Sequence, residues 1–342
     1  MIEFGQASDI LKKYNQEHVL RFYDELSNRS KEKLLLQIES IDFDTATSIL
    51  CEEIKGDVTI EPIAVRPRRD VLTESERFLS IGLNAIKAGK VAAVMFAGGE
   101  GSRLGASIPK AMVNIGVTRE LYIIQCLFNN LSKVSKKADC TIPLFIMTSD
   151  STHEELEQFL SEKNYFGYDR NYVTLFKQEM LPALDFDGKI IMKSKDSIAL
   201  SPNGNGGWLV SMEHGGLTGR LSELGIEWVN VFAVDNVLQS IADPLFIGAV
   251  IDSGCESGSK VIKKASAAER VGVLCKKNGR SGVVEYYEFP DELRSVKNEF
   301  GDLVYSHGVT LNYIFKLSAL QSQMSDRPII HLAKKRDRKS VV

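Results

Sequence analysis

Apolar positions along the chain follow two different spacings. In the first 55 residues they recur every three or four positions, as in Leu34, Leu35 and Ile38, which predicts amphipathic helices. Further along, short apolar runs such as Val91–Phe96 and Ile226–Val234 are bounded by turn-forming residues, as is typical of buried strands. Because these runs alternate with helical segments, the pattern predicts an α/β fold with a mixed, mostly parallel sheet flanked by helices.

The same spacings locate the individual elements. Helices are expected at residues 79–88, 121–134, 208–224 and 244–251, and a capping box of Ser151 and Glu154 predicts another that ends at Glu162. Strands are expected at residues 91–96, 142–148, 172–176, 226–234, 261–263, 271–275 and 283–287, with a turn at Asn278–Gly279 joining the last two. Near the N-terminus, one predicted helix face carries Val19, Phe22, Tyr23 and Leu26, and Asp44 is expected to cap a third helix.

Composition and charge add a domain division and exclude one class of partner. The 342 residues are 44% hydrophobic and 25% charged, which is an ordinary globular composition. We expect residues 1–70 to form a helical region and connector, residues 71–330 one main domain, and residues 331–342 a basic tail. The formal net charge of −3 provides no global basic field, so a nucleic-acid partner is not expected.

Cysteine and histidine usage indicates the compartment and argues against a zinc site. Five cysteines and five histidines are scattered, with neither Cys-x-x-Cys nor His-Glu-x-x-His. The first residues lack the pattern of a secretory signal, and no apolar run reaches the length of a membrane span. We therefore expect a cytoplasmic protein with reduced thiols and no membrane partner.

The most informative stretch is the loop from Phe96 to Gly105, with the sequence Phe-Ala-Gly-Gly-Glu-Gly-Ser-Arg-Leu-Gly. Glycines directly after a buried strand let backbone N–H groups approach a phosphate chain, and Arg103 and Lys110 add positive charge beside them. One interpretation is therefore a cradle for a nucleoside triphosphate. The other is a tight strand-to-helix turn with charged surface residues.

Two common phosphate motifs do not fit this loop. The dinucleotide fingerprint Gly-x-Gly-x-x-Gly fails because Gly99 and Gly101 are followed by Leu104, and the next glycine, Gly105, comes one place late. The Walker A motif fails because Gly105 is followed by Ala106 instead of Lys.

Three more loops are expected beside this one, since ligands of open α/β sheets bind at the carboxyl ends of the strands. Gln178 offers an amide suited to reading a base edge, or it is a surface glutamine. The glycines of residues 201–207 allow close approach to a flat ring, or they form a solvent loop. Asp235 is placed to hold Mg²⁺, or with Asn236 it caps the helix that begins near Pro244.

Taken together, these segments resemble a known family. Gly-Gly-x-Gly-Ser-Arg-Leu-Gly followed by Pro109–Lys110 is similar to the signature loop of sugar nucleotidyltransferases, most closely the eukaryotic UDP-N-acetylhexosamine pyrophosphorylases and their UDP-sugar pyrophosphorylase relatives. Further matching segments lie at residues 89–92, 147–149, 187–189, 203–207, 234–236, 243–244, 271–273, 283–286 and 331–335. The resemblance covers residues 8–335 and implies a Rossmann-like, GT-A-like nucleotidyltransferase domain.

The resemblance also implies roles for individual residues. It implies that UTP phosphates are held by Gly98, Gly99, Gly101 and the two catalytic cations Arg103 and Lys110, and that uracil is read by Gln178 and Gly204. It implies a sugar-phosphate site made of Asn205, Asp235, Gly272, Glu285 and Lys264, with Mg²⁺ or Mn²⁺ on Asp235. The implied substrates are UTP and an N-acetylhexosamine 1-phosphate, and the products are a UDP-sugar and pyrophosphate.

Some positions depart from the family pattern. Ser102, Ala111 and Asn203 replace threonine, glycine and aspartate, and Val309 stands where the family has an asparagine that touches the sugar. The family also continues past the Lys-Lys pair at 334–335 into a lobe with a further phosphate-binding lysine. The expected activity is formation of UDP-N-acetylglucosamine from UTP and N-acetylglucosamine 1-phosphate. The alternatives are a UDP-glucose or UDP-sugar pyrophosphorylase, or a nucleotide-binding form with little activity.

Overall fold

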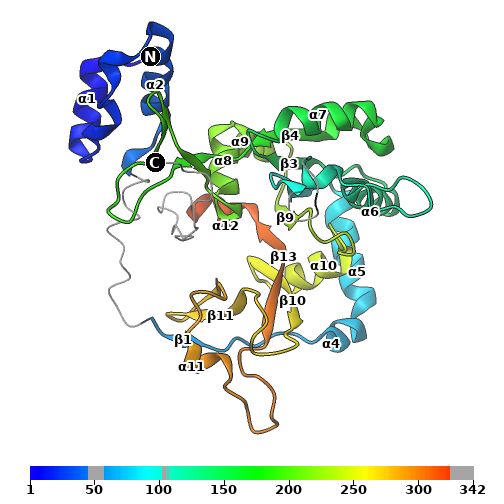
Figure 1. Ribbon diagram of the computed structural model, residues 1–342. Coiled ribbons are helices and arrows are strands. Elements are labelled where there is room, and N and C mark those ends of the chain that lie inside the picture. Colours follow the sequence, from blue (N-terminus) through cyan, green and yellow to red (C-terminus); the bar gives the residue numbers. More distant parts are fainter. Residues whose placement is uncertain (45–57, 102–104, 106–107, 324–342) are drawn as a thin grey trace. The chain divides into compact units, whose positions relative to one another are not determined.

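The computed structural model describes residues 1–44, 58–101, 105 and 108–323. The chain forms two compact units (Figure 1). In the described part, the smaller unit consists of residues 1–44 and 179–207, and the larger unit of residues 58–178 and 208–323. The larger unit is therefore assembled from two stretches of chain that are separated by a segment of the smaller one.

One mixed sheet forms the centre of the larger unit. Over the described residues it has nine strands in the order β1-β11-β13-β9-β2-β3-β4, with β10 beside β13 and β12 beside β11. The strands are β1 (Ile60–Glu61), β2 (Val91–Phe96), β3 (Leu144–Thr148), β4 (Val173–Lys177), β9 (Trp228–Ala233), β10 (Ser257–Lys263), β11 (Val273–Lys277), β12 (Arg280–Val284) and β13 (His307–Lys316). The neighbours β9, β2, β3 and β4 are parallel, whereas the pairs made by β1, β10, β11, β12 and β13 are antiparallel. The predicted mixed α/β class is confirmed.

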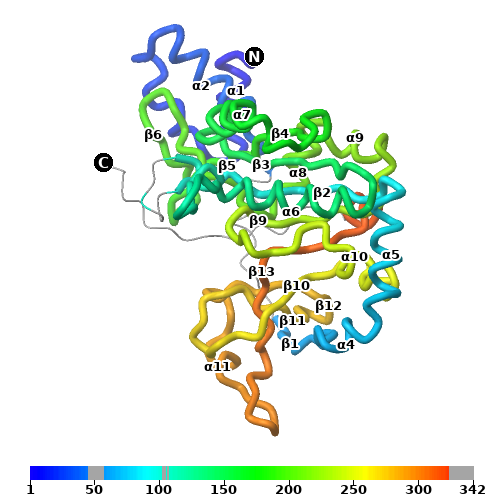
Figure 2. The backbone as a smooth tube through the Cα atoms, turned by 90° about the vertical axis from the view of Figure 1, so that its right-hand side faces the viewer, coloured from blue at the N-terminus to red at the C-terminus, as the bar shows by residue number. Residues whose placement is uncertain are grey.

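Helices cover both faces of this sheet (Figures 1 and 2). Alternate residues of β2 point to opposite faces and join two different core clusters. One face packs on α5 (Ser75–Lys87), α6 (Ile123–Ala138), α7 (His153–Glu162) and α10 (Pro244–Asp252), and the other on α8 (Trp208–His214), α9 (Leu217–Glu223) and α12 (Leu317–Gln323). The remaining elements of this unit are α4 (Arg68–Thr73), α11 (Asp291–Arg294) and the 3₁₀ turns η4 (Lys110–Met112), η5 (Asn164–Gly167) and η6 (Arg170–Tyr172). No helix of the described chain is both long and apolar enough to span a bilayer.

The helices α5 and α10 lie side by side (Figure 2) and approach backbone to backbone. A Cβ atom at Gly82 would lie 1.9 Å from the carbonyl oxygen of Pro244, and one at Gly248 would lie 1.8 Å from that of Phe78. Each helix therefore needs a glycine where the two cross.

The structure also corrects two expectations for this unit. The sequence pattern did not predict β13, because its buried positions include polar Asn312 and its regular backbone is interrupted at Leu311 (φ 53°). The predicted Ser151–Glu154 capping box is wrong: α7 begins at His153, and the Ser151 hydroxyl donates to Glu100 Oε1 at 3.4 Å instead.

The smaller unit packs N-terminal helices against two short two-stranded sheets, β5 with β8 and β6 with β7. Its elements are α1 (Phe4–Lys13), η1 (Glu17–Leu20), η2 (Tyr23–Glu25), α2 (Asn28–Ser40), β5 (Met180–Pro182), β6 (Met192–Ser194), β7 (Ser197–Ile198), β8 (Leu200–Pro202) and η7 (Asn205–Gly207). Gln16 is buried and connects the two parts, since its amide donates to Gly188 O and accepts from the Ile190 N–H, each at 2.9 Å. The single helix face predicted for residues 19–26 is wrong, because two 3₁₀ turns stand there. The helix expected after Asp44 lies outside the described residues.

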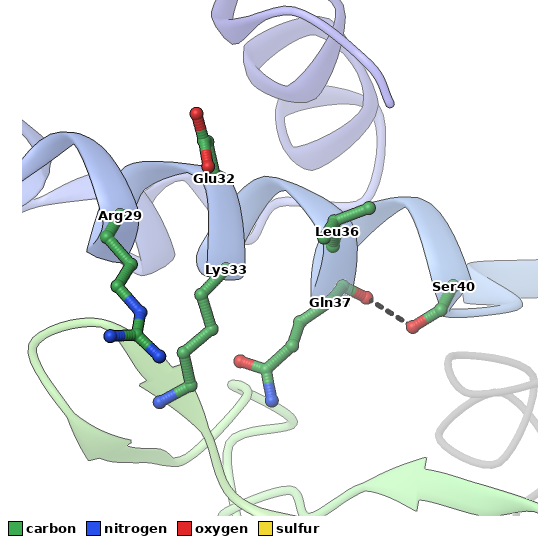
Figure 3. A pocket seen from close by; sticks show the side chains of 6 residues that line it. All are labelled: Arg29, Glu32, Lys33, Leu36, Gln37 and Ser40. Atoms are coloured by element: carbon green, nitrogen blue, oxygen red, sulfur yellow. Dashed lines mark hydrogen bonds between the residues drawn. The ribbon is translucent and has the colours of Figure 1, made fainter.

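A shallow hollow of about 460 Å³ runs along α2 (Figure 3). Figure 3 shows Lys33 and Gln37 pointing from α2 toward the neighbouring hairpin, and Glu32 pointing away. Gln37 accepts the Ile198 N–H at 3.1 Å, and Lys33 lies 3.8 Å from Asp196. These polar groups hold the hairpin, so we assign the hollow a packing role.

Candidate functional site

Three of the predicted loops meet at one edge of the sheet. The loops at Gly98, Gln178 and Asp235 follow the carboxyl ends of β2, β4 and β9, which are parallel strands of the larger unit. The expected grouping of these three loops is therefore present in the fold.

The loop after β2 folds back on the segment that carries Lys110. The Gly101 N–H donates to Ile108 O at 2.9 Å, and the Lys110 N–H donates to Gly99 O at 3.0 Å. These bonds place Lys110 beside the end of the strand, in the turn η4. Arg103 lies outside the described residues.

Lys110 and Asp235 form an ion pair at this edge. The Lys110 Nζ lies 2.8 Å from Asp235 Oδ1, with 23% of the lysine side chain and 61% of the aspartate side chain exposed. Because β2 and β9 are adjacent and in parallel register, residues that follow their ends are brought together. The predicted catalytic cation thus faces the predicted metal carboxylate.

Gln178 is held against Gly98. The Gln178 backbone N–H donates to Thr148 O at 2.8 Å, and the residue as a whole is only 9% exposed. A Cβ atom at Gly98 would lie 3.2 Å from the Ser149 nitrogen and 3.5 Å from Gln178 Cδ. Among the described residues the Gln178 side-chain amide makes no hydrogen bond.

A hydroxyl network that the sequence analysis did not single out organises the end of β3. Thr148 Oγ1 donates to Phe176 O at 3.0 Å and lies 2.7 Å from His153 Nδ1. The Ser149 N–H donates to Thr152 Oγ1 at 3.1 Å. The signal for this network is the Thr-Ser pair that ends a strand followed at once by a helix. It fixes the backbone against which Gly98 and Gln178 pack.

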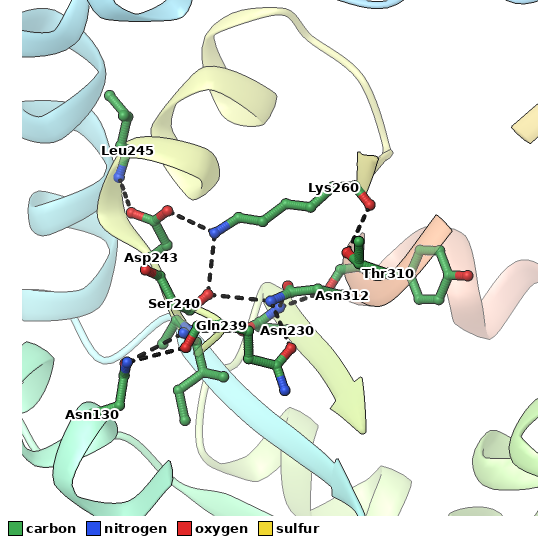
Figure 4. Close-up of polar contacts among 12 residues, drawn as sticks. Asn130, Asn230, Gln239, Ser240, Asp243, Leu245, Lys260, Thr310 and Asn312 are labelled. Carbon is green, nitrogen blue, oxygen red and sulfur yellow. Dashed lines mark hydrogen bonds and ion pairs between the residues drawn. The ribbon is translucent and has the colours of Figure 1, made fainter. Parts of the chain in front are cut away.

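The loop that carries Asp235 is fastened by a buried amide network (Figure 4). Asn230 Nδ2 donates to Asn312 Oδ1 at 3.0 Å, and Asn312 Nδ2 donates to Gln239 Oε1 at 3.1 Å. Gln239 Nε2 donates to Ala233 O at 2.6 Å, and the Ala242 N–H donates to Asn230 Oδ1 at 2.6 Å. Both asparagines are 1% exposed, and a fully paired buried network of this kind restricts the loop to one conformation.

The alternative role for Asp235 as a helix cap is wrong. The helix α10 is capped by Asp243, whose Oδ1 accepts the Leu245 N–H at 3.1 Å. Lys260 supports this cap, because its Nζ lies 2.7 Å from Asp243 Oδ2. The Asp235 carboxylate is therefore not used by the helix.

Gly272 and Glu285, two residues of the predicted sugar site, lie on one face of the antiparallel half of the sheet, beside Val309. A Cβ atom at Gly272 would lie 3.5 Å from Glu285 Oε1 and 3.3 Å from Val309 Cγ2. The Val309 N–H donates to Gly272 O at 2.9 Å. The Glu285 carboxylate also affects Tyr313. The pKa of the Tyr313 phenol is raised to about 12, mainly by burial and also by the negative charge of Glu285.

Lys264 lies on the opposite face from Glu285. A Cβ atom at Gly308 would lie 2.8 Å from Val271 and 3.6 Å from Lys264 Cγ. Because neighbouring residues of a strand point to opposite faces, the face of Gly308 and Val271 is not the face of Val309 and Gly272. The structure does not group Lys264 with the other predicted sugar residues of this unit.

Gly204 and Asn205 belong to the smaller unit. Their loop follows β8, which pairs with β5 in a separate two-stranded sheet, so the expectation that it follows a strand of the main sheet is wrong. Gly204 has φ +77°, and the preceding Asn203 donates to Glu179 Oε2 at 3.1 Å. The roles predicted for these two residues remain predictions.

For a metal ion, Asp235 is the carboxylate to consider. No group of three or more His, Cys, Asp or Glu side chains suited to a metal occurs in the part of the chain that the structure describes. Mg²⁺ commonly binds one or two protein carboxylates and completes its octahedron with substrate phosphates and water. An exposed Asp235 at the end of a strand fits that donor set, and it does not fit a closed protein-only site.

Comparison with known proteins identifies relatives over most of the chain. The model of the family described as UTP--glucose-1-phosphate uridylyltransferase matches residues 45–341. The UDP-N-acetylhexosamine pyrophosphorylase-like protein 1 of Mus musculus is 34% identical over 89% of this chain and 64% of its own length. The UDP-N-acetylglucosamine diphosphorylase 2 of Arabidopsis thaliana is 35% identical over 95% of this chain and 70% of its own length.

A solved structure agrees with the fold. The uridine diphosphate N-acetylglucosamine pyrophosphorylase of Trypanosoma brucei, crystallised with an inhibitor, matches with a TM-score of 0.80 and 26% identity. The match covers 93% of this chain and 69% of that structure. The chain spans less than two thirds of the mouse relative's length, as the 64% coverage states.

Proposed function

Because the chain belongs to the UTP--glucose-1-phosphate uridylyltransferase family, we propose that it transfers a uridylyl group from UTP to N-acetylglucosamine 1-phosphate. The products are UDP-N-acetylglucosamine and pyrophosphate. The observation that carries this proposal is the meeting of Lys110 and Asp235 beside the glycine loop and Gln178, at one edge of the parallel strands.

The nucleotide is bound at the ends of β2 and β4. Backbone groups of Gly98, Gly99 and Gly101 line the phosphates, with Lys110 and Arg103 supplying positive charge. Gln178 offers a donor and an acceptor to uracil, and the near-complete burial of its side chain favours a strong contact.

The reaction needs positioning and charge neutralisation, and no protein nucleophile. An oxygen of the sugar phosphate attacks the α-phosphorus of UTP in line, the bond to the bridging oxygen breaks, and pyrophosphate leaves. Lys110 leaves its ion pair with Asp235 and contacts a phosphate oxygen of UTP, where it stabilises the negative charge that develops during the reaction. Asp235 would hold Mg²⁺ or Mn²⁺, which would neutralise phosphate charge.

The sugar is received on the face that carries Gly272 and Glu285. The Glu285 carboxylate accepts hydrogen bonds from sugar hydroxyls. Val309 Cγ2 and Glu285 Oε1 both lie within 3.5 Å of the position of a Cβ atom at Gly272, so Val309 brings an apolar side chain to the site. This observation favours a second candidate, a UDP-glucose or UDP-sugar pyrophosphorylase, whose substrate has no acetamido group to bind.

A pyrophosphate-release assay with UTP, Mg²⁺ and a panel of hexose 1-phosphates tests the proposal. We expect release with N-acetylglucosamine 1-phosphate at a higher kcat/KM than with glucose 1-phosphate. The reverse order would support the second candidate. Binding of UTP without pyrophosphate release from any sugar would contradict both.

A further inference from the structure

A hollow of about 390 Å³ lies in the larger unit, on the opposite face of the antiparallel strands from Glu285. Its lining includes three cationic residues, Lys264, Arg270 and Arg294, and one carboxylate, Glu269. Its size is within the usual range of small-molecule sites, about 300–1,000 Å³. None of the roles proposed above for the reaction requires this hollow.

The ammonium group of Lys264 is short of partners. The residue is 8% exposed, and the nearest printed acceptor of its Nζ is Ala267 O, at the limiting distance of 3.5 Å. Among the described residues no carboxylate lies within 4.0 Å of it. An ammonium has three donors, and a buried charge is costly unless it is paired. Burial is the main reason that the pKa of Lys264 is lowered, Arg294 adds to the decrease, and Glu269 opposes it.

Two of the neighbouring charged residues, Arg294 and Glu269, are held by other contacts. Arg294 donates to the carbonyl oxygens of Phe289 at 3.0 Å and Tyr286 at 2.9 Å, which fixes its guanidinium group beside the hollow. The Glu269 carboxylate accepts a hydrogen bond from the Ala265 N–H at 2.6 Å, which holds together the loop of residues 265–269. Neither group makes a hydrogen bond to Lys264 in the described part of the chain, so the donors of its ammonium are left for a group that enters the hollow.

The remaining wall is apolar and aromatic. It includes Tyr286, Tyr287 and Phe289, and the two tyrosine rings pack edge to face with centroids 5.2 Å apart. Such rings offer a flat apolar surface beside a fixed cation. A ligand that uses both features carries an anionic group and an apolar body.

We propose that this hollow is a binding site for a small organic phosphate, with its anionic group on Lys264 and its apolar part against Tyr286, Tyr287 and Phe289. The site is separate from the proposed reaction, because it lies across the sheet from Gly272 and Glu285. The proposal does not depend on the chain having any catalytic activity.

The test is calorimetric titration of the whole chain with phenyl phosphate and with inorganic phosphate, in the presence and absence of saturating UTP. We expect saturable binding of phenyl phosphate at least tenfold tighter than that of inorganic phosphate, and unchanged by UTP. Lys264→Met should weaken it at least tenfold. The matched control is Lys263→Met, which removes an exposed lysine paired with Asp302 and should bind normally.

A second variant keeps the test decisive if Lys264→Met fails to fold. Ala268→Trp fills the hollow from its exposed rim and leaves Lys264 in place, and it should also abolish binding of phenyl phosphate. Normal binding by the folded variants would overturn the proposal. So would displacement by UTP, which would assign the phosphate to the reaction site, or equal affinity for the two probes, which would show that the aromatic wall contributes nothing.

Discussion

Single residues at the edge of the parallel strands have separable tasks. Gly98 provides space where a Cβ would meet the backbone of Ser149, and the Gln178 side-chain amide lies beside that space. Lys110 and Asp235 form an ion pair, in which we expect substrate phosphates to replace Asp235. Each task can be tested by substituting one residue at a time.

Gln178→Ala should weaken UTP binding and reduce the preference for UTP over CTP. A site that hydrogen-bonds a base loses about 1–3 kcal/mol when one partner is left unpaired. Titration with both nucleotides measures this effect. Gln158→Ala on the exposed face of α7 is the control and should bind both as the wild type does. If Gln178→Ala kept the wild-type ratio of affinities, Gln178 would not read the base.

Lys110→Met should reduce kcat about 100- to 1,000-fold. This is the usual loss when one charged group or hydrogen-bond donor that stabilises the transition state is removed. Pyrophosphate release under saturating substrates measures the change. The control is Lys90→Met, which breaks an exposed 2.7 Å pair with Glu227 near the start of β2. The Lys90→Met variant should keep full activity. If a folded Lys110→Met variant also kept full activity, Lys110 would have no part in the mechanism.

At the scale of elements, close packing of helices holds the edge of the sheet in place. The crossing of α5 and α10 depends on Gly82 and Gly248, because any Cβ there would overlap a backbone carbonyl. In contrast, Gly219 in α9 has no atom within 4 Å of the position of a Cβ. The same residue type is therefore required in one helix and replaceable in another.

Gly82→Ala should destabilise the larger unit by about 1–3 kcal/mol or more, since overpacking forces the helices apart. Gly219→Ala should stabilise it by about 0.5–1 kcal/mol through the higher helix propensity of alanine. Urea unfolding of both variants provides a matched comparison. Equal stabilities would show that the crossing adjusts without cost.

At the scale of the whole larger unit, a parallel half that carries the proposed nucleotide-binding residues joins an antiparallel half that carries the proposed sugar-binding residues. The strand β13 makes this connection, since it pairs with β9 toward its end, with β11 at Gly308 near its start, and with β10 along most of its length. The amide network of Asn230, Asn312 and Gln239 crosses the same junction and holds the loop of Asp235 (Figure 4).

Asn312→Leu should weaken both stability and turnover, because it leaves Gln239 and Asn230 with fewer buried partners. Each buried group left unpaired costs about 1–3 kcal/mol. The urea midpoint and kcat should both fall, whereas Asn171→Leu, at an exposed asparagine, should change neither. A loss of stability with unchanged kcat would show that the network does not position Asp235.

Short-range signals in the sequence were sufficient for the fold class, for the strands that end in the site and for the candidate residues themselves. A buried apolar run, a glycine turn or a polar residue after a strand is encoded by neighbouring positions, so Gly98, Gln178 and Asp235 could be named without coordinates. Long-range pairing required the fold: the parallel register of β2 and β9 brings Lys110 to Asp235. The same holds for β13, whose buried Asn312 is stable only because distant amides pair with it, and for Lys264, whose face depends on strand register. A one-residue shift in register would move each of these side chains to the other face, and no local pattern specifies that choice.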